Sequence, residues 1–296
     1  MIEFINFYLI PGIVLGGIYA LGAIGVSMLF GIMRFAHFAH GDFLTFGAYI
    51  ALPLITYVGL HPILGAIGSA LIVAVIAMSI DQICYKPLRP RSTIVLVMAS
   101  LGVALMLRST IQLTFGVEIF SYNPGVIMKP MQFDWFLIKS KDIWIIAASI
   151  ILMFAIHCLL SYTKVGKAMR AMSDSVELAK LTGIPTERIV KITWAVGGGL
   201  AAIAGVFLAW KTQLQTMLGW QVLLPIFAAT ILGGIGRPYG AMLGGLVIGL
   251  AEELSSYPWI GEEPLLSPGY KTGVAFALMI IMLILRPQGI LKGRVF

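Results

Sequence analysis

Nine long apolar stretches dominate this sequence, and each is long enough to cross a lipid bilayer as a helix of about 17 to 25 residues. They cover residues 9–33, 43–60, 62–84, 92–115, 142–162, 190–210, 220–236, 239–256 and 270–286. Because 59% of the 296 residues are hydrophobic and only 11% are charged, a soluble globular domain is excluded. We expect an all-α polytopic membrane protein with eight to ten transmembrane helices, forming one transmembrane domain over residues 1–296.

Basic residues are concentrated in alternate loops between these stretches. When the polar loop 164–191 is placed in the cytoplasm, 14 of the 20 Lys and Arg residues fall on that side. Positive charges favour the cytoplasmic side of a membrane. The pattern predicts an N-terminus outside, a C-terminus in the cytoplasm and a location in the inner (plasma) membrane. It also accounts for the net charge of +7 without a nucleic-acid partner.

The loop KVGKAMRAMSDSVELAKLTGIPTERIVK is the one long polar run in the chain. Asp174 followed by Glu177 is a variant of the capping box, and Gly183 is typical of the residue that ends a helix. These signals predict a helix over 175–182. A helix this short is marginal alone in water, so it needs a partner surface. The loop is either a connector packed on the membrane bundle or an element that docks another protein.

Glycine is frequent, with 33 residues, and several follow the small-xxx-small spacing that lets helices approach closely in lipid. The pairs and triplets are Gly12 and Gly16; Gly236, Gly240 and Gly244; and Gly245 and Gly249. Within the stretch LGGIGRPYG, residues 232–240, we single out Gly233, Gly234 and Gly236. They indicate either dense packing or a broken helix that exposes backbone groups to a transport pathway.

Ionisable side chains gather after the first apolar stretch. His37, His40 and Asp42 are of the types that bind transition metals, but no third partner of convincing spacing accompanies them. The alternatives are a hydrogen-bonded structural junction or part of a transport pathway or its cytoplasmic gate. We therefore retain His37, Phe38, His40 and Asp42 as candidate pathway or gate residues.

Arg108 lies inside the fourth apolar stretch. A charge at that depth is expensive and normally faces the bundle interior or water. The alternative is that the helix ends early and the side chain extends to the membrane surface. Arg108 is therefore a further candidate pathway residue.

Several catalytic and nucleotide-binding motifs are absent. The chain has no G-x-x-x-x-G-K-[ST] loop for ATP, no G-x-S-x-G nucleophile elbow and no H-E-x-x-H zinc helix. Asp81 is the only acidic residue clearly inside an apolar stretch, whereas ion-coupled carriers usually have several. We expect a protein that is not an enzyme, has no cofactor of its own and takes its energy from a partner.

Four blocks resemble the integral-membrane permease subunits of branched-chain amino acid ABC importers, specifically the smaller H-type permease. The blocks are LGGIYALGAIGVSML (15–29), FGIMRFAHFAHGDFLTFGAY (30–49), the segment 165–184, and ILGGIGRPYGAMLGGLVIGL (231–250). They extend over nearly the whole chain in the order of the family. The resemblance implies a second homologous permease, two cytoplasmic ATPase subunits that bind ATP, and an extracytoplasmic substrate-binding protein as partners.

The resemblance also implies a role for the polar loop. In such importers a cytoplasmic E-A-A-x-x-x-G element docks in a groove of the ATPase. Glu177, Ala179 and Gly183 stand in register with it, and Leu178 replaces the middle alanine. Together with the cap at Asp174, these residues form the ATPase-coupling element that the resemblance implies.

One departure from the family concerns the cargo. The family block usually has asparagine before F-A-H-G, where this chain has His37. Similar systems import urea, short amides or aromatic acids instead of branched-chain amino acids, so these cargoes remain alternatives. The other alternative is a secondary transporter that works alone.

Overall fold

The computed structural model describes residues 2–122, 131–133, 136–259, 267–291 and 293. Within these residues nine helices are 15 residues or longer, and each matches one predicted apolar stretch. They are α2 (Ile10–Met33), α3 (His40–Thr56), α4 (Pro62–Ile80), α6 (Thr93–Phe115), α7 (Ser140–Tyr162), α10 (Thr186–Lys211), α11 (Leu218–Gly233), α12 (Pro238–Leu254) and α13 (Lys271–Leu285). The prediction of an all-α membrane protein is confirmed.

Short elements connect or extend these helices. They are α1 (Ile2–Phe4), the π-helical turn η1 (Ile5–Leu9), a second π-helical turn η2 (Asp81–Tyr85), α5 (Lys86–Leu88), α8 (Lys164–Asp174), α9 (Val176–Leu181) and the 3₁₀ turn η3 (Pro268–Tyr270). A small antiparallel hairpin, β1 (Met131–Phe133) and β2 (Phe136–Ile138), pairs Met131 with Ile138. The sequence analysis did not predict this hairpin, which lies between α6 and α7.

Among the residues whose positions are described, five continuous helical segments are long and apolar enough to cross a membrane. They are Ile5–Met33, Pro62–Leu88, Thr93–Phe115, Ser140–Tyr162 and Thr186–Lys211. The helices α3, α11, α12 and α13 have 17, 16, 17 and 15 residues. At about 1.5 Å per residue they are shorter than the roughly 30 Å apolar layer of a bilayer. Several therefore begin or end inside the bundle, where neighbouring helices cover their ends.

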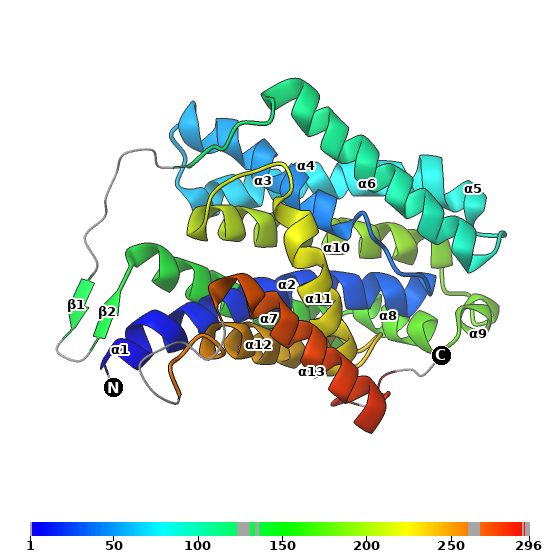
Figure 1. The fold of residues 1–296 in the computed structure, drawn as a ribbon. Helices are drawn as coiled ribbons and strands as arrows, with labels where there is room; N and C mark the ends of the chain where they lie inside the picture. Colours follow the sequence, from blue (N-terminus) through cyan, green and yellow to red (C-terminus); the bar gives the residue numbers. More distant parts are fainter. Residues whose placement is uncertain (1, 123–130, 134–135, 260–266, 292, 294–296) are drawn as a thin grey trace.

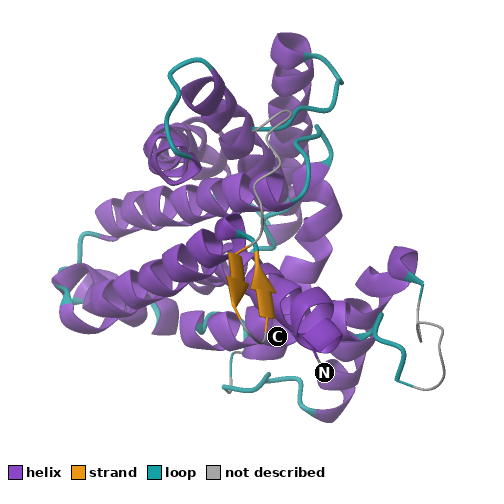
Figure 2. Ribbon diagram, turned by 90° about the vertical axis from the view of Figure 1, so that its left-hand side faces the viewer, coloured by secondary structure: helices purple, strands orange, loops and turns teal. Residues whose placement is uncertain are grey.

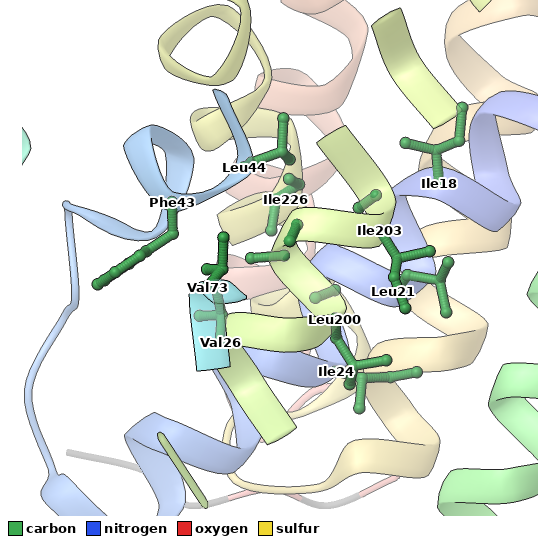
Figure 3. Close-up of a cluster of buried hydrophobic side chains, with 14 of the residues drawn as sticks. Ile18, Leu21, Ile24, Val26, Phe43, Leu44, Val73, Leu200, Ile203 and Ile226 are labelled. Carbon is green, nitrogen blue, oxygen red and sulfur yellow. The ribbon is translucent and has the colours of Figure 1, made fainter. Parts of the chain in front are cut away.

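The helices α2 and α10 form the buried centre of the bundle. Helix α12 packs along α2, while α3, α4 and α11 pack around the pair (Figure 1). Apart from the small hairpin, the regular structure drawn for the described residues is helical (Figure 2). Their contact is filled by aliphatic side chains, among them Ile24 of α2, Val73 of α4 and Ile203 of α10 (Figure 3). Close approach of α2 and α12 depends on glycine: a Cβ at Gly16 would lie 3.0 Å from the Leu246 Cα. The small-xxx-small spacing thus marks helix packing.

The outer helices present large apolar side chains away from the protein. Examples are Leu71 of α4, Leu113 of α6, Phe154 of α7 and Leu285 of α13, each more than 60% exposed. In water such a surface would drive aggregation, whereas lipid tails solvate it. The exposed apolar belt is therefore the lipid-facing surface.

The two ends of the bundle differ. One end carries the β1–β2 hairpin and the C-terminus of α10, and the opposite end carries α5, α8 and α9 (Figure 1). We call these the hairpin end and the α9 end. The basic residues that the sequence analysis assigns to the cytoplasm in 86–91 and 164–191 lie at the α9 end.

Candidate functional site

The chain re-enters the bundle after α2. Arg34 ends α2 in the left-handed conformation, with φ of 56°, and the non-helical connector 35–39 follows it. His40 then donates from Nε2 to the Gly22 carbonyl, 3.1 Å away. Because Gly22 lies 11 residues before the end of α2, α3 begins about 16 Å inside the bundle. Irregular backbone at this depth is tolerated because protein surrounds it.

The N-terminus of α11 meets the N-terminus of α3 in the bundle interior. Gly219 donates its backbone N–H to the Thr45 hydroxyl at 2.8 Å. The backbones touch at Gly41 and Gly219, since a Cβ at Gly41 would lie 2.6 Å from the Gly219 carbonyl oxygen. Two interrupted helices thus direct their positive ends to one interior region. This resembles the broken helices that form binding regions in transporters.

His37 is held in an aromatic cluster beside this region. Its Nε2 lies 3.0 Å from the Tyr85 hydroxyl, and its ring packs edge-on against Trp194 with centroids 4.9 Å apart. Tyr85 in turn stacks on Trp194. All three side chains are buried. Phe38 packs on Phe227 of α11, so the residues 37 and 38 connect the re-entrant segment to α10 and α11.

Asp42 and Arg108 form a two-point ion pair. Arg108 donates from Nε to Asp42 Oδ1 at 3.0 Å and from Nη2 to Oδ2 at 3.1 Å. The guanidinium also lies over the Trp220 ring, 5.1 Å from its centroid. Helix α6 continues past Arg108 to Phe115, and the side chain is 14% exposed. The alternative in which Arg108 extends to the membrane surface is therefore wrong.

The His37 and His40 rings lie edge to face with centroids 6.1 Å apart, but the polar atoms of His37, His40 and Asp42 contact different partners. His37 contacts Tyr85, His40 contacts the Gly22 carbonyl, and Asp42 pairs with Arg108. Among the residues with described positions, no group of three or more His, Cys, Asp or Glu side chains is placed to hold a metal ion. The geometry thus gives the metal alternative no support.

The glycine-rich stretch breaks the helix between α11 and α12. Gly234 and Gly236 adopt positive φ angles of 111° and 77°. Gly233 and Gly234 are buried, and the C-terminal segment covers them, because Ile290 donates its N–H to the Leu232 carbonyl at 2.9 Å. Gly236 instead lines a cavity of about 280 Å³ near the α9 end. The predicted break exists, and two of its three glycines are packed against backbone.

The short helix α9 begins one residue later than predicted. Asp174 is the last residue of α8 and is exposed, and the N-cap is Ser175, whose hydroxyl accepts from the Leu178 N–H at 3.3 Å. The predicted capping box between Asp174 and Glu177 is therefore wrong. An extended residue is needed between the two helices, and Ser175 has φ of −156° and ψ of 116°.

The end of α9 follows the predicted glycine termination. Gly183 has φ of 82°, its N–H donates to the Lys180 carbonyl, and the Ile184 N–H donates to the Ala179 carbonyl, both at 3.1 Å. This pair of bonds is a complete Schellman motif. It fixes the direction in which the chain leaves α9 and enters α10.

The outer surface of α9 combines exposed leucines with one acidic and one basic residue, Glu177 and Lys180. Ala179 faces inward and is 3% exposed, while Leu178 is 64% and Leu181 is 84% exposed. Glu177 is also exposed. Exposed leucines beyond the end of the apolar belt have neither lipid nor core to cover them, which is typical of a protein-binding surface.

A charge network beside α9 was not predicted. Arg89 makes a two-point ion pair with buried Asp81, at 2.6 and 2.7 Å, and donates to Glu187 at 3.0 Å. Lys86 also pairs with Glu187 at 3.0 Å. Glu187 lies in the first turn of α10, directly after α9, so the network ties η2 and α5 to α10. The sequence places Asp81 inside an apolar stretch. Its partner is Arg89, which comes close to it because the chain turns through α5.

Acidic residues of α12 form a second unpredicted cluster, at the hairpin end. Tyr19 donates to Glu252 at 2.8 Å, and both side chains are buried. Glu253 lies 2.6 Å from Lys271 and 3.6 Å from Lys211. Asp81 is thus not the only carboxylate in the interior, because Asp42 and Glu252 are also buried. Each of the three is hydrogen-bonded or ion-paired.

The chain matches a known protein family over most of its length. The model of the family described as "Branched-chain amino acid transport system / permease component" matches residues 8–283. The chain belongs to this family. It is a permease component of a transport system and a multi-pass membrane protein, as its lipid-facing helices also indicate.

Curated relatives of this permease cover nearly its full length. The high-affinity branched-chain amino acid transport system permease protein LivH of Salmonella typhimurium is 32% identical, over 95% of this chain and 93% of the relative. The protein BraD of Pseudomonas aeruginosa, with the same description, is 31% identical over 96% of this chain and 94% of the relative. Both relatives are thus described as transport permeases.

One solved structure has a similar fold. A chain of PsaBC from Streptococcus pneumoniae in complex with Fab has a TM-score of 0.51 and 14% sequence identity to this permease. The match covers 97% of this chain and 95% of that chain. At this identity the likeness concerns the fold alone.

Proposed function

We propose that this permease is the membrane subunit of an ATP-driven importer of branched-chain or other hydrophobic amino acids. It acts with a second homologous permease, two cytoplasmic ATPase subunits that bind ATP, and an extracytoplasmic substrate-binding protein. In this assignment the protein lies in the inner membrane. The hairpin end and the N-terminus face outward, and the α9 end and the C-terminus face the cytoplasm. The observation that supports the proposal most directly is the exposure of Leu178 and Leu181 on α9.

Docking of the ATPase to α9 accounts for its surface and its ends. The face with Glu177, Leu178 and Leu181 contacts the ATPase, while Ala179 rests on the permease. Asp174 ends the preceding helix, and Gly183 fixes the exit of the chain. A displacement of α9 is passed on to α10 through the Schellman turn. The same displacement reaches η2 through the ion pair between Glu187 and Arg89, which lies beside α9.

The candidate pathway and gate residues fall into two groups. His37, Phe38, His40, Asp42 and Arg108 surround the meeting point of α3 and α11 in the bundle interior. Displacement of η2 moves Tyr85, whose hydroxyl contacts His37, and so connects α9 to this region.

The second group is Gly233, Gly234 and Gly236. These residues form the turn between α11 and α12 near the α9 end. In the proposed mechanism they give α11 a hinge at its cytoplasmic end, because two of them adopt backbone angles that favour glycine.

The experiment that tests the proposal is gentle purification of the tagged permease from its native membrane, followed by mass spectrometry of the proteins that accompany it. Recovery of an ATPase and a second permease is the expected result. If the permease is recovered alone and still transports amino acids without ATP, the proposal is wrong and the protein is a secondary transporter.

A further inference from the structure

A cavity at the hairpin end is the starting point of a further inference, which rests on the proposed function. Its volume is about 550 Å³, and four helices surround it: α2, α10, α11 and α12. Lys211, Glu253 and the amide side chains of Gln213, Gln215 and Gln221 line it. We call it the outer vestibule. None of its residues belongs to the pathway and coupling groups described above.

The vestibule carries both signs of charge in a partly buried setting. The Lys211 side chain is 16% exposed and the Glu253 side chain 14%. Glu253 has its shorter ion pair with Lys271, at 2.6 Å, while its distance to Lys211 is 3.6 Å. Lys211 also donates to the Pro11 carbonyl at 2.8 Å. An ammonium group has three donors, so Lys211 keeps a donor for a carboxylate ligand.

Neutral hydrogen-bonding groups stand next to this pair. Gln215 donates from Nε2 to the side-chain oxygen Oε1 of Gln221 at 2.9 Å, which holds the two side-chain amides side by side. Each amide carries more donors and acceptors than this one bond uses. Behind the Tyr19 wall, Glu252 Oε1 has no hydrogen-bond partner among the described residues, although the side chain is buried. A second carboxyl group, that of Glu252, therefore lies behind the residues that line the cavity.

The other wall of the vestibule is aliphatic. It consists of Leu15 of α2, Leu208 of α10, and Leu218 and Val222 of α11. One helical turn further along α2 and α11 the two helices touch, because a Cβ at Gly22 would lie 2.7 Å from Ile226 Cδ1. This α2–α11 contact lies next to the aliphatic wall, on the side toward the α9 end.

We infer that the outer vestibule is a binding site for the zwitterionic form of a small aliphatic α-amino acid. Lys211 pairs with the carboxylate, and Glu253 pairs with the ammonium group. The glutamine amides supply further hydrogen bonds, and the leucine and valine wall covers the aliphatic side chain. The permease itself, and not only an extracytoplasmic binding protein, then recognises the amino-acid head group before the α2–α11 contact opens.

The test uses the complete assembly purified with the permease, placed in nanodiscs without any binding protein, and measures equilibrium binding of radiolabelled leucine. We expect saturable binding that isoleucine and valine compete. 3-Methylbutylamine, which lacks the carboxylate, and 4-methylpentanoate, which lacks the ammonium group, should compete poorly. Equal competition by either analogue would overturn the inference, because a site that ignores one charge is not a zwitterion site.

Variants give a matched comparison. Lys211→Met should weaken leucine binding about tenfold or more, because hydrogen bonds to charged groups are among the stronger ones. Lys139→Met makes the same change on an exposed lysine near the hairpin, outside the vestibule, and should leave binding unchanged. Gln221→Leu alters an exposed side chain, so it should weaken binding without disturbing the fold. Wild-type affinity in both vestibule variants would overturn the inference.

Failure of the inference and failure of the proposed function are separable. Binding is measured without ATP, whereas the proposed function requires ATP-driven uptake by wild-type protein. If the wild type imports leucine but binds none in nanodiscs, the vestibule inference is overturned while the importer assignment stands. If Lys211→Met lowers uptake without any leucine binding by the wild type, Lys211 contacts a partner protein and the inference is again overturned.

Discussion

Arg108 of α6 and Asp42 of α3 are joined by two hydrogen bonds of 3.0 and 3.1 Å, although they are separated by 66 residues in the chain. Helix α6 packs mainly against α3. The ion pair, together with Trp220, therefore holds α3, α6 and the start of α11 together in the bundle interior. Removing one partner leaves a buried charge without compensation, which typically costs about 3–5 kcal/mol.

The pair predicts strong coupling in a double-mutant cycle. Arg108→Met and Asp42→Asn should each lower the thermal stability of the purified assembly and its uptake rate. The double variant should be more stable than the sum of the single effects predicts, because neither charge is left alone. Thermal unfolding of the four proteins provides the measurement. Additive losses would show that the ion pair does not matter for stability.

Gly183 provides a test of the α9 termination. Gly183→Val should lower ATP-driven uptake while membrane insertion persists, because a β-branched residue does not tolerate the φ of 82°. Gly183→Asn is the control, since asparagine adopts this conformation more readily. Space is not the cause, because no atom of the described residues lies within 4 Å of a Cβ placed there. Undiminished uptake in the valine variant would count against the proposed role of the turn.

The exposed face of α9 predicts the strength of ATPase binding. Leu181→Asp should reduce the amount of ATPase that co-purifies with the permease, because it places a charge where an apolar surface is proposed to dock. Lys180→Ala, at an exposed neighbouring position, should retain it. The measurement is the ratio of ATPase to permease after purification. Equal ratios in the two variants would place the ATPase contact elsewhere.

The Arg89 network predicts two effects of different size. Arg89→Met should destabilise the assembly strongly, because Asp81 is fully buried and loses a two-point ion pair. Glu187→Gln should have little effect on stability, since its side chain is 54% exposed. If Glu187 transmits movement of α9, the Gln variant should nevertheless lower uptake per ATP hydrolysed. Uptake and ATP hydrolysis measured together decide this, and an unchanged ratio would contradict transmission.

Glycine positions give a stability test of the fold. Gly219→Ala should destabilise the protein severely, because its Cβ would overlap the Gly41 carbonyl group where α3 meets α11. Gly102→Ala is the matched control, because it has open space and lies within α6. Alanine in a helix is favoured over glycine by up to about 1 kcal/mol. Thermal unfolding should therefore move in opposite directions, and a stable Gly219→Ala protein would contradict the close contact.

The sequence predicts those features that depend on local chemistry. Hydropathy locates all nine long helices, since each must satisfy its backbone in lipid. Glycine spacing predicts close helix packing, which the structure shows between α2 and α12, and Gly183 predicts the end of α9. The N-cap was assigned to Asp174 instead of Ser175 because both side chains are good caps and stand next to each other.

Features that depend on long-range packing could not be read from the sequence. Hydropathy does not reveal that the segment 34–39 returns into the bundle, because a buried and an exposed connector have similar composition. The partner of Arg108 is fixed only when α3 and α6 are packed together. Lys211 and the three glutamines lie within residues 211–221, but Glu253 comes from α12, so the outer vestibule is complete only when α12 is packed against them.

Leucine uptake by proteoliposomes that contain the complete assembly, with a loaded binding protein outside and ATP enclosed, distinguishes an ATP-driven importer from a secondary transporter. We expect accumulation that requires enclosed ATP, needs no ion gradient and is lost in Leu181→Asp. Accumulation that proceeds without ATP, or that follows an ion gradient, would contradict an importer driven through α9.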